Sequence, residues 1–374
     1  MTNNKEKKVL NVPNLRFPEF TDKWEAGKLE EYILLVSGQD LSSEQYTDKE
    51  DVYPYITGAS SLNSEGIILN RWTHTPTQIV KRGDILLVCK GSGVGQLTVL
   101  SNVDKAHIAR QIMGIRAKNT ESQLFIYHYL SRLMTELKKR STGIIPGIDR
   151  KSILSLHISI PSLQEQQKVA ELLSLIEQRI ITQNKIIEKL QSLIKGLRVC
   201  CMQRVYGNNV YLSEIAQIYQ PQTISSTELT EDGFLVYGAN GIIGKYKDYN
   251  HETEQICITC RGNTCGMVNY TKPMSWITGN AMVINTDKYQ DKVCKRYLYH
   301  YLSAYNFNSI ISGSGQPQIV RTPLEKLKIT LPTISEQKQK AIIFDKIQDK
   351  IDINHKVLNL YIGQKQYLLR QMFI

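Results

Sequence analysis

Two glycine-rich segments carry the side chains best suited to bind a phosphate or a base. They are Lys90-Gly91-Ser92-Gly93-Val94-Gly95 and Arg261-Gly262-Asn263-Thr264-Cys265-Gly266. A glycine-rich loop that binds a dinucleotide follows a strand and opens a helix, whose N-terminus faces the phosphates. Residues 97–100, Leu-Thr-Val-Leu, instead continue the first segment as a strand pattern. We therefore predict glycine-rich turns between strands at both places.

Amides and cations recur at matched positions around these turns, which favours nucleic-acid binding. Lysines and glycine-loop N–H groups hold phosphates, whereas arginine, asparagine and glutamine read base edges. The net charge of +11 also favours a polyanionic partner, nucleic acid before membrane. The predicted nucleic-acid site comprises Lys90, Gly91, Ser92, Gly93, Arg110, Gln111, Arg261, Gly262, Asn263, Thr264 and Asn280. The alternative for each of these residues is a solvated polar turn.

No other group of residues in the sequence forms a catalytic or metal-binding set. The sequence contains no Gly-x4-Gly-Lys-Ser/Thr loop and no Pro-Pro dipeptide of the kind found in DNA methyltransferase loops. Cys257, Cys260 and Cys265 suggest zinc, but the first half of the chain has only Cys89 in this region, so we interpret them as buried reduced thiols. His128 and His300 are interpreted as core residues. We predict no catalytic residue, no metal and no cofactor.

Two long amphipathic helices must position the turns. Between residues 161 and 204, apolar residues alternate in steps of three and four, the seam of a coiled coil, with one polar exception at Gln183. The pattern returns 171 residues later, over 332–374, with Asn354 in place of Gln183. Both helices follow the same motif, Ile160-Pro161-x-x-x-Glu165-Gln166 and Leu331-Pro332-x-x-x-Glu336-Gln337. Ser162 and Glu165 predict a capping box at the first helix.

The globular parts of the chain are also repeated. Tyr-His-Tyr-Leu-Ser occurs at 127–131 and again at 299–303, and the loop 141–148 is matched by 312–319. Continuous strands are predicted over 108–115 and 277–284. We predict an α+β protein with a globular domain at 1–160, a helix at 161–204, a second domain at 205–331 and a second helix at 332–374. The helices should pair antiparallel with pseudo-two-fold symmetry, bringing Gln183 to Asn354.

This organisation resembles the DNA-specificity subunit of type I restriction–modification systems. The two Pro-x-x-x-Glu-Gln motifs carry the resemblance, together with the opening Leu15-Arg16-Phe17-Pro18-Glu19-Phe20 and Trp24, and it covers nearly the whole chain. It implies that each domain is a target-recognition domain that reads one half of a bipartite, asymmetric DNA sequence. The helices would set the spacer and dock two methyltransferase subunits. Partner subunits would methylate adenine and, with ATP-dependent restriction subunits, cleave DNA, so this chain would be non-catalytic.

A duplicated coiled-coil scaffold or an RNA-binding module is the alternative function. It predicts weak, sequence-blind binding with a steep salt dependence. The sequence has no run of 18 apolar residues and begins with a polar, charged stretch instead of a signal peptide. Seven cysteines, an odd number, suggest no disulfide framework. We therefore expect a cytoplasmic protein without a membrane span.

Overall fold

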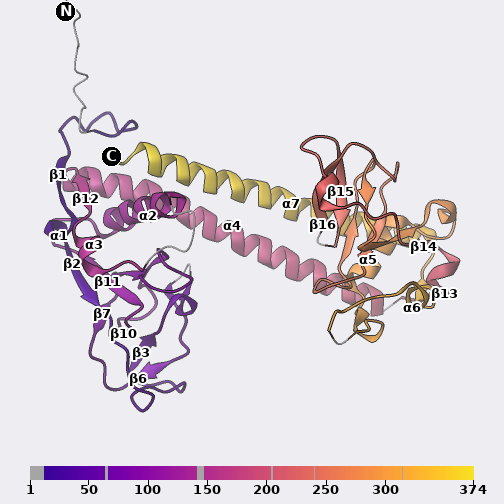
Figure 1. The fold of residues 1–374 in the computed structure, drawn as a ribbon, viewed down its shortest axis with the longest axis horizontal. Coiled ribbons are helices and arrows are strands. Elements are labelled where there is room, and N and C mark those ends of the chain that lie inside the picture. Colours follow the sequence, from indigo (N-terminus) through magenta and orange to yellow (C-terminus); the bar gives the residue numbers. More distant parts are fainter. Residues whose placement is uncertain (1–11, 64–65, 141–146, 204, 240, 314) are drawn as a thin grey trace, which may run out of the picture. The chain divides into compact units, whose positions relative to one another are not determined.

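The computed structural model describes residues 12–63, 66–140, 147–203, 205–239, 241–313 and 315–374. The chain divides into two compact units, Met1–Asn184 with Lys356–Ile374, and Lys185–His355. Each unit contains one mixed α+β domain and parts of two long helices, α4 (Leu163–Gln203) and α7 (Ile334–Gln371), which can be followed in Figure 1.

The first domain contains two four-stranded sheets. One is antiparallel with the order β2-β11-β8-β9, and the other has the order β6-β3-β10-β7, in which β3 and β10 are parallel. The elements are β1 (Glu25–Lys28), α1 (Leu29–Tyr32), β2 (Ile33–Ser37), β3 (Tyr53–Ile56), β4 (Leu62–Asn63), β5 (Gly66–Ile67), β6 (Trp72–Thr73), β7 (Ile79–Lys81), β8 (Ile85–Val88), β9 (Leu97–Val99), β10 (Lys105–Ile108), β11 (Ile112–Ala117), α2 (Gln123–Arg140), α3 (Arg150–Leu154) and β12 (His157–Ile160).

The second domain repeats the antiparallel sheet and the parallel strand pair, with three strands instead of four in the second sheet, and this confirms the predicted internal repeat. Its antiparallel sheet β14-β20-β17-β18 has the connectivity of β2-β11-β8-β9, and the parallel pair β15–β19 corresponds to β3–β10. The elements are β13 (Asn208–Tyr211), β14 (Gln217–Tyr219), β15 (Phe234–Gly238), β16 (Gly241–Tyr246), β17 (Ile256–Thr259), β18 (Val268–Tyr270), β19 (Trp276–Ile277), β20 (Ala281–Asn285), α5 (Lys295–Ala304), α6 (Arg321–Glu325) and β21 (Lys328–Leu331).

The two strands predicted over 108–115 and 277–284 are each broken by a tight turn. The N–H of Ile112 donates to the carbonyl of Ala109 at 2.8 Å, and the N–H of Ala281 donates to the carbonyl of Thr278 at 3.0 Å. Gln111 lies in the first of these turns instead of on a strand, and Asn280 occupies the same place in the second. Short polar breaks, Arg110-Gln111 and Gly279-Asn280, mark the turns in the sequence, but the strands on both sides are buried and their apolar pattern suggests one continuous strand.

The motif glutamine ties the start of each long helix to the start of a domain helix. Gln166 is buried, and its side-chain oxygen accepts from the N–H of Ser122, just before α2, at 2.9 Å. Its side-chain nitrogen donates to the carbonyl of the motif proline at 3.0 Å. Gln337 makes the same two bonds before α5, to the N–H of Cys294 at 2.8 Å and to its own motif proline at 2.9 Å.

The predicted capping box at Glu165 is wrong, because this carboxylate is engaged by a remote arginine. Both oxygens of the buried Glu165 accept from Arg16 at 2.7 Å, and one also accepts from the indole N–H of Trp24 at 3.3 Å. A capping box does form at the second helix, where Glu336 accepts from the N–H of Thr333 at 3.1 Å and from its hydroxyl at 2.9 Å.

The repeated histidines are buried against the long helices, as predicted. Nε2 of His128 lies 3.1 Å from the hydroxyl of Ser174 on α4, and burial lowers the pKa of His128 to about 4. His300 donates from Nε2 to Asp345 on α7 at 2.8 Å and accepts at Nδ1 from Arg198 on α4 at 2.8 Å. Burial also lowers the pKa of His300, so the neutral ring joins α5 to both long helices.

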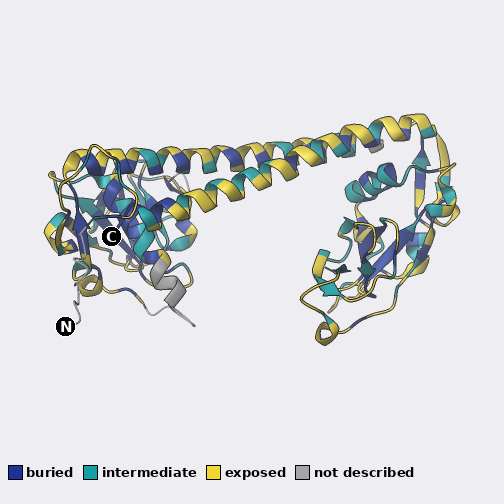
Figure 2. Cartoon of the chain, turned by 90° about the horizontal axis from the view of Figure 1, so that it is seen from above, coloured by how far each residue is buried: buried dark blue, intermediate teal, exposed yellow. Residues whose placement is uncertain are grey.

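The long helices pair antiparallel in both units. In the first unit, Lys365 of α7 bonds Glu177 of α4 at 2.7 Å, and Leu368 of α7 lies in one core cluster with Leu173 of α4. In the second unit, the early α7 residue Phe344 clusters with the late α4 residue Ile194. Figure 2 shows buried residues inside the domains and long exposed stretches on both helices. The meeting of Gln183 and Asn354 stays a prediction.

The residues after α7 complete the core of the first domain. Phe373 is buried, and its ring centroid lies 6.5 Å from that of Trp24, 5.1 Å from Phe125 and 5.2 Å from Tyr129. The N–H of Leu15 donates to the carbonyl of Gln371 at 2.9 Å, which brings the opening segment to the same place.

Phe373→Ala should lower the free energy of unfolding of the first unit by about 3–5 kcal/mol, because it leaves a cavity among aromatic rings. Tyr367→Ala on the same helix is the control, since its side chain is 53% exposed and its loss should change stability by less than about 0.5 kcal/mol. Urea denaturation followed by tryptophan fluorescence measures both. If the two variants lost equal free energy of unfolding, Phe373 would not be part of this core.

Candidate nucleic-acid interface

The first glycine-rich segment forms the turn between β8 and β9, as predicted. Gly91 and Gly95 have φ angles of 85° and 80°, in the left-handed region that glycine adopts without strain. The N–H of Gly95 donates to the carbonyl of Val88 at 2.9 Å, and the N–H of Val94 to that of Gly91 at 3.2 Å. These bonds close the turn and leave the side chains of Lys90 and Ser92 exposed.

Three segments that are distant in sequence meet at this turn. The N–H of Cys89 donates to the carbonyl of Gln111 at 2.8 Å, and the N–H of Ile148 donates to the carbonyl of Cys89 at 2.9 Å. The side-chain oxygen of Gln111 covers Gly58, where an added Cβ would meet it at 2.9 Å. The structure thus brings together the predicted residues Lys90, Gly91, Ser92, Gly93, Arg110 and Gln111. The matched loop at 141–146 lies outside the described residues.

The second domain builds the same arrangement with the same main-chain hydrogen bonds. The N–H of Cys260 donates to the carbonyl of Asn280 at 3.0 Å, and the N–H of Ile319 donates to the carbonyl of Cys260 at 3.0 Å. Gly262 and Gly266 have φ angles of 85° and 90°, close to those in the first turn. The predicted residues Arg261, Gly262, Asn263, Thr264 and Asn280 are therefore also brought together.

Two of the predicted side chains are engaged within the chain. Nε of Arg110 pairs with Asp40 at 2.7 Å, and the backbone N–H of Arg110 donates to the same carboxylate at 3.1 Å. The hydroxyl of Thr264 donates to the carbonyl of Ala239 at 3.4 Å. The ion pair is largely exposed, so it contributes only a few tenths of a kcal/mol and Arg110 can exchange this partner for another anion.

The structure adds residues to the second site that sequence reasoning missed. The N–H of Gly262 donates to the carbonyl of Pro317 at 3.0 Å, and Ser312 and Gln318 exchange main-chain hydrogen bonds at 2.9 and 2.8 Å. A hollow of about 340 Å³ lies beside this segment. It is lined by Tyr219, Gln220, Arg261, Met282, Gln318, Ile319, Val320 and Arg321. The only signal in the sequence was the match between the loops 141–148 and 312–319.

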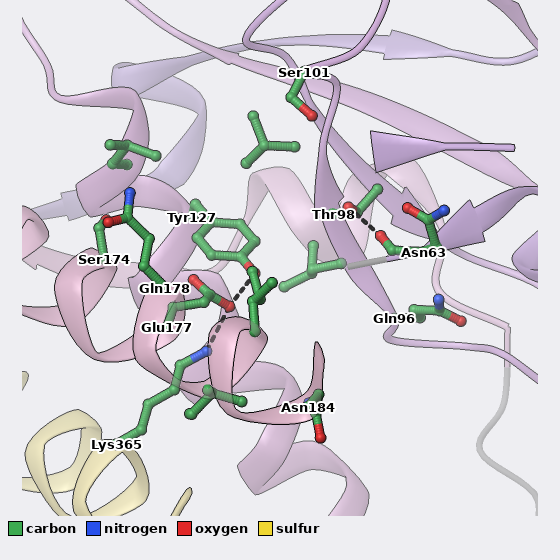
Figure 3. A pocket seen from close by; sticks show the side chains of 15 residues that line it. Asn63, Gln96, Thr98, Ser101, Tyr127, Ser174, Glu177, Gln178, Asn184 and Lys365 are labelled. Atoms are coloured by element: carbon green, nitrogen blue, oxygen red, sulfur yellow. Dashed lines mark hydrogen bonds and ion pairs between the residues drawn. The ribbon is translucent and has the colours of Figure 1, made fainter. Parts of the chain in front are cut away.

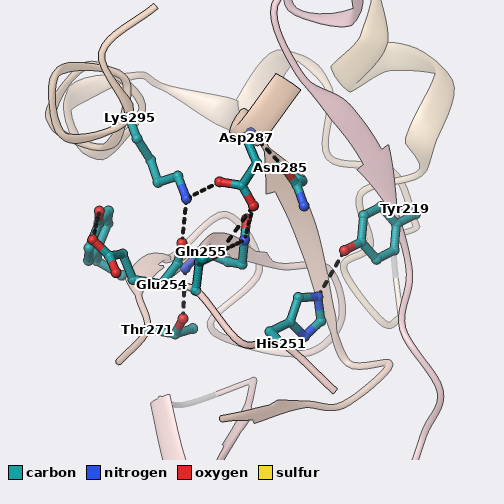
Figure 4. A network of polar contacts seen from close by, with 10 residues as sticks. Tyr219, His251, Glu254, Gln255, Thr271, Asn285, Asp287 and Lys295 are labelled. Atoms are coloured by element: carbon teal, nitrogen blue, oxygen red, sulfur yellow. Dashed lines mark hydrogen bonds and ion pairs between the residues drawn. The ribbon is translucent and has the colours of Figure 1, made fainter. Parts of the chain in front are cut away.

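The second domain also contains a network of polar contacts (Figure 4). Asp287 accepts from Lys295 at 2.5 Å and from the amide of Gln255 at 2.8 Å. Burial would raise the pKa of Asp287, but these hydrogen bonds hold it below its usual range. Tyr219, which lines the hollow, shares a 2.9 Å hydrogen bond with Nε2 of His251.

A larger hollow of about 540 Å³ lies in the first unit beside α4 and β9 (Figure 3). Glu177 faces it and accepts from the hydroxyl of Tyr127 at 3.0 Å and from Lys365 at 2.7 Å. Burial opposes ionisation of Glu177, but Lys365 offsets this and holds the pKa of the carboxylate below its usual range. The ion pair joins α4 to α7 and the hydrogen bond from Tyr127 adds α2, so Glu177 has a structural role.

The cysteines of the described residues form no metal site. Cys257 and Cys260 are buried thiols, and burial raises the pKa of Cys257 to about 12. In this part of the chain, no group of three or more His, Cys, Asp or Glu residues could hold a metal ion. No helix of the described residues has the length and apolar character needed to cross a membrane.

Comparisons with known proteins match both domains. The family model described as the type I restriction modification DNA specificity domain matches residues 21–192 and again 208–360. The type I restriction enzyme MjaVIII specificity subunit of Methanocaldococcus jannaschii is 25% identical over 94% of this chain and 92% of its own length. The EcoprrI specificity subunit of Escherichia coli is 31% identical over 38% of this chain and 36% of its own.

Solved structures show the same fold at low sequence identity. A crystal structure of the type I restriction–modification S subunit from M. genitalium has a TM-score of 0.69 and 17% identity. That likeness covers 97% of this chain and 99% of the other. A structure from a study of the assembly of a type I restriction–modification system has a TM-score of 0.56 and 15% identity, over 92% of this chain and 96% of the other.

Gln111→Ala should change the free energy of unfolding by less than about 0.5 kcal/mol, because its carbonyl and not its exposed side chain holds Cys89. Thr259→Val is the contrasting variant. Thr259 is fully buried and its hydroxyl donates to the carbonyl of Ala239, so losing this bond should cost about 0.5–1.5 kcal/mol. Urea denaturation followed by circular dichroism compares the two. A large loss for Gln111→Ala would show that its side chain is structural.

Proposed function

The chain belongs to the family of type I restriction–modification DNA specificity domains, and from this premise we propose that each of its two domains reads one half of a bipartite DNA target. The turn between β8 and β9 with Gln111 would contact one half-site. The turn between β17 and β18 with Asn280 would contact the other. This assignment goes beyond family membership and rests on the geometry of the two turns.

The observation that carries the proposal is that the two sites have the same main-chain hydrogen bonds, which form a shared frame, and differ in their side chains. The frame places a lysine and a serine in the first turn where the second has Arg261 and Asn263. These residues are exposed, together with Gln111 and Asn280. Different donors and acceptors in the same frame select different bases, so the target should be asymmetric.

We further propose that the paired helices separate the domains and dock two methyltransferase subunits. Large apolar side chains are exposed along both helices, at Leu175 and Leu193 on α4 and at Ile342 and Ile353 on α7. Such residues on otherwise polar helices suit a helical partner. A separation of about one duplex turn, roughly 34 Å, would place the two domains on the same face of DNA.

Catalysis would then belong to the partner subunits. The methyltransferase subunits would modify adenine, and ATP-dependent restriction subunits would join them for cleavage. This chain would bring sequence recognition to a complex in the cytoplasm. Its positive charge of +11 would supply sequence-independent attraction to DNA.

Methylome sequencing tests the function directly. A host that expresses this chain with its neighbouring methyltransferase is compared with a host that lacks this chain. A new methyladenine motif with two half-sites and a fixed gap is expected. If the complex assembles and no new motif is found, the duplicated scaffold or RNA-binding module is favoured. Binding of unrelated RNA and DNA duplexes at several salt concentrations then distinguishes the scaffold from the RNA-binding module.

Replacing residues 1–160 by those of a relative should change one half-site and leave the other half-site and the gap unchanged. The reason is that the turns of the two domains share no residues and belong to different units. Methylome sequencing of the exchanged chain is the measurement. A change in both half-sites would disprove the assignment of one domain to one half-site.

A further inference from the structure

Equivalent glycines of the two domains lie under different side chains, an amide in the first domain and an isoleucine in the second. Gly58 lies two residues after β3 and Gly238 is the last residue of β15, the strands that pair in parallel, and each glycine precedes an alanine beside the glycine-rich turn. An added Cβ on Gly58 would meet the side-chain oxygen of Gln111 at 2.9 Å. On Gly238 it would meet two side-chain carbons of Ile243 at 3.0 Å.

A β-bulge presents Ile243 at this position. Val236 on β15 pairs with Gly244 on β16, and Tyr237 pairs with Ile242, so Ile243 is one extra residue on β16. A bulge interrupts the alternation of faces and redirects side chains. As a result the two neighbours Ile242 and Ile243 are both exposed, by 54% and 44%.

These isoleucines lie next to the predicted interface. The carbonyl of Ala239, one residue after Gly238, accepts from the hydroxyls of Thr259 and Thr264, the second of which belongs to the glycine-rich turn. In the first domain, the hairpin that follows the parallel strand buries Leu62 and Ile67 and exposes Ile68. What distinguishes the second domain is that an exposed isoleucine lies over the glycine, whereas the atoms nearest Gly58 belong to Gln111.

We propose that Ile242 and Ile243 are specificity-determining residues that contact the 5-methyl group of a thymine in the second half-site. This inference rests on the proposed DNA-reading function. The thymine methyl is the apolar group that base pairs offer in the major groove, and apolar side chains recognise it there. Polar neighbours, Arg261 and Asn280, would bond the adjacent base edges and phosphates. In the first domain, the side-chain amide of Gln111 lies over the equivalent glycine, and an amide suits adenine.

The test uses the complex of this chain with its methyltransferase and the target found by methylome sequencing. Each thymine of both half-sites is replaced in turn by deoxyuridine, which lacks only the methyl group. One replacement in the second half-site should weaken binding by about fourfold, the value of one buried methyl group. In Ile243→Ala, binding to the thymine and the deoxyuridine duplexes should be nearly equal.

The control variant is Ile68→Ala, an isoleucine of the first domain with 43% exposure, which should keep the wild-type discrimination. An unchanged melting temperature of Ile243→Ala shows that the variant is folded. Three results would overturn the inference while a bipartite motif leaves the proposed function intact. The first is a second half-site without thymine, and the second is unchanged binding after every deoxyuridine replacement. The third is an equal loss of affinity for the thymine and deoxyuridine duplexes in Ile243→Ala, which would indicate that the side chain is a wedge between base pairs. The absence of a bipartite motif would instead overturn the proposed function.

Discussion

The main-chain groups of one cysteine in each domain hold the candidate sites together. Cys89 and Cys260 follow the central strands β8 and β17, and in each case the N–H bonds one neighbouring turn and the carbonyl bonds another segment. Buried backbone groups must be paired, so these bonds cannot be given up without a large cost. Because they involve no side chain, the residues around them can differ while the geometry stays the same. A frame of this kind suits a protein whose two copies of one site have different partners.

The helix junctions impose a second constraint of the same kind. Gln166 and Gln337 are buried amides, and a buried amide is tolerated only when its donors and acceptors are bonded. Each satisfies the N–H before a domain helix and the carbonyl of a proline before a long helix. Within each unit, one glutamine side chain therefore fixes the starts of both the domain helix and the long helix. This explains why the same motif stands before both helices.

The sequence predicted the features that depend on periodicity and on the internal repeat. These include the two long helices, the duplicated domains, the glycine-rich turns and the buried histidines. It failed where a contact joins distant residues or where burial hides a break. Arg16 takes the carboxylate of Glu165 from its expected capping role, and the turns that contain Gln111 and Asn280 are marked only by short polar breaks between apolar strands. The bulge at Ile243 has no signal, because it is defined only by how β15 and β16 pair.

Charge and specificity are separate properties of this surface. The net charge of +11 attracts any duplex and cannot distinguish one sequence from another. Discrimination requires side chains that differ in donor, acceptor or apolar character at a fixed distance from the bases. The position above Gly58 and Gly238 meets this requirement, since the frame is shared and the covering group changes from the amide of Gln111 to the hydrocarbon of Ile243. Under the proposed function, a change from amide to hydrocarbon would alter the preferred base without moving the frame, and a duplicated domain would in this way acquire a second half-site.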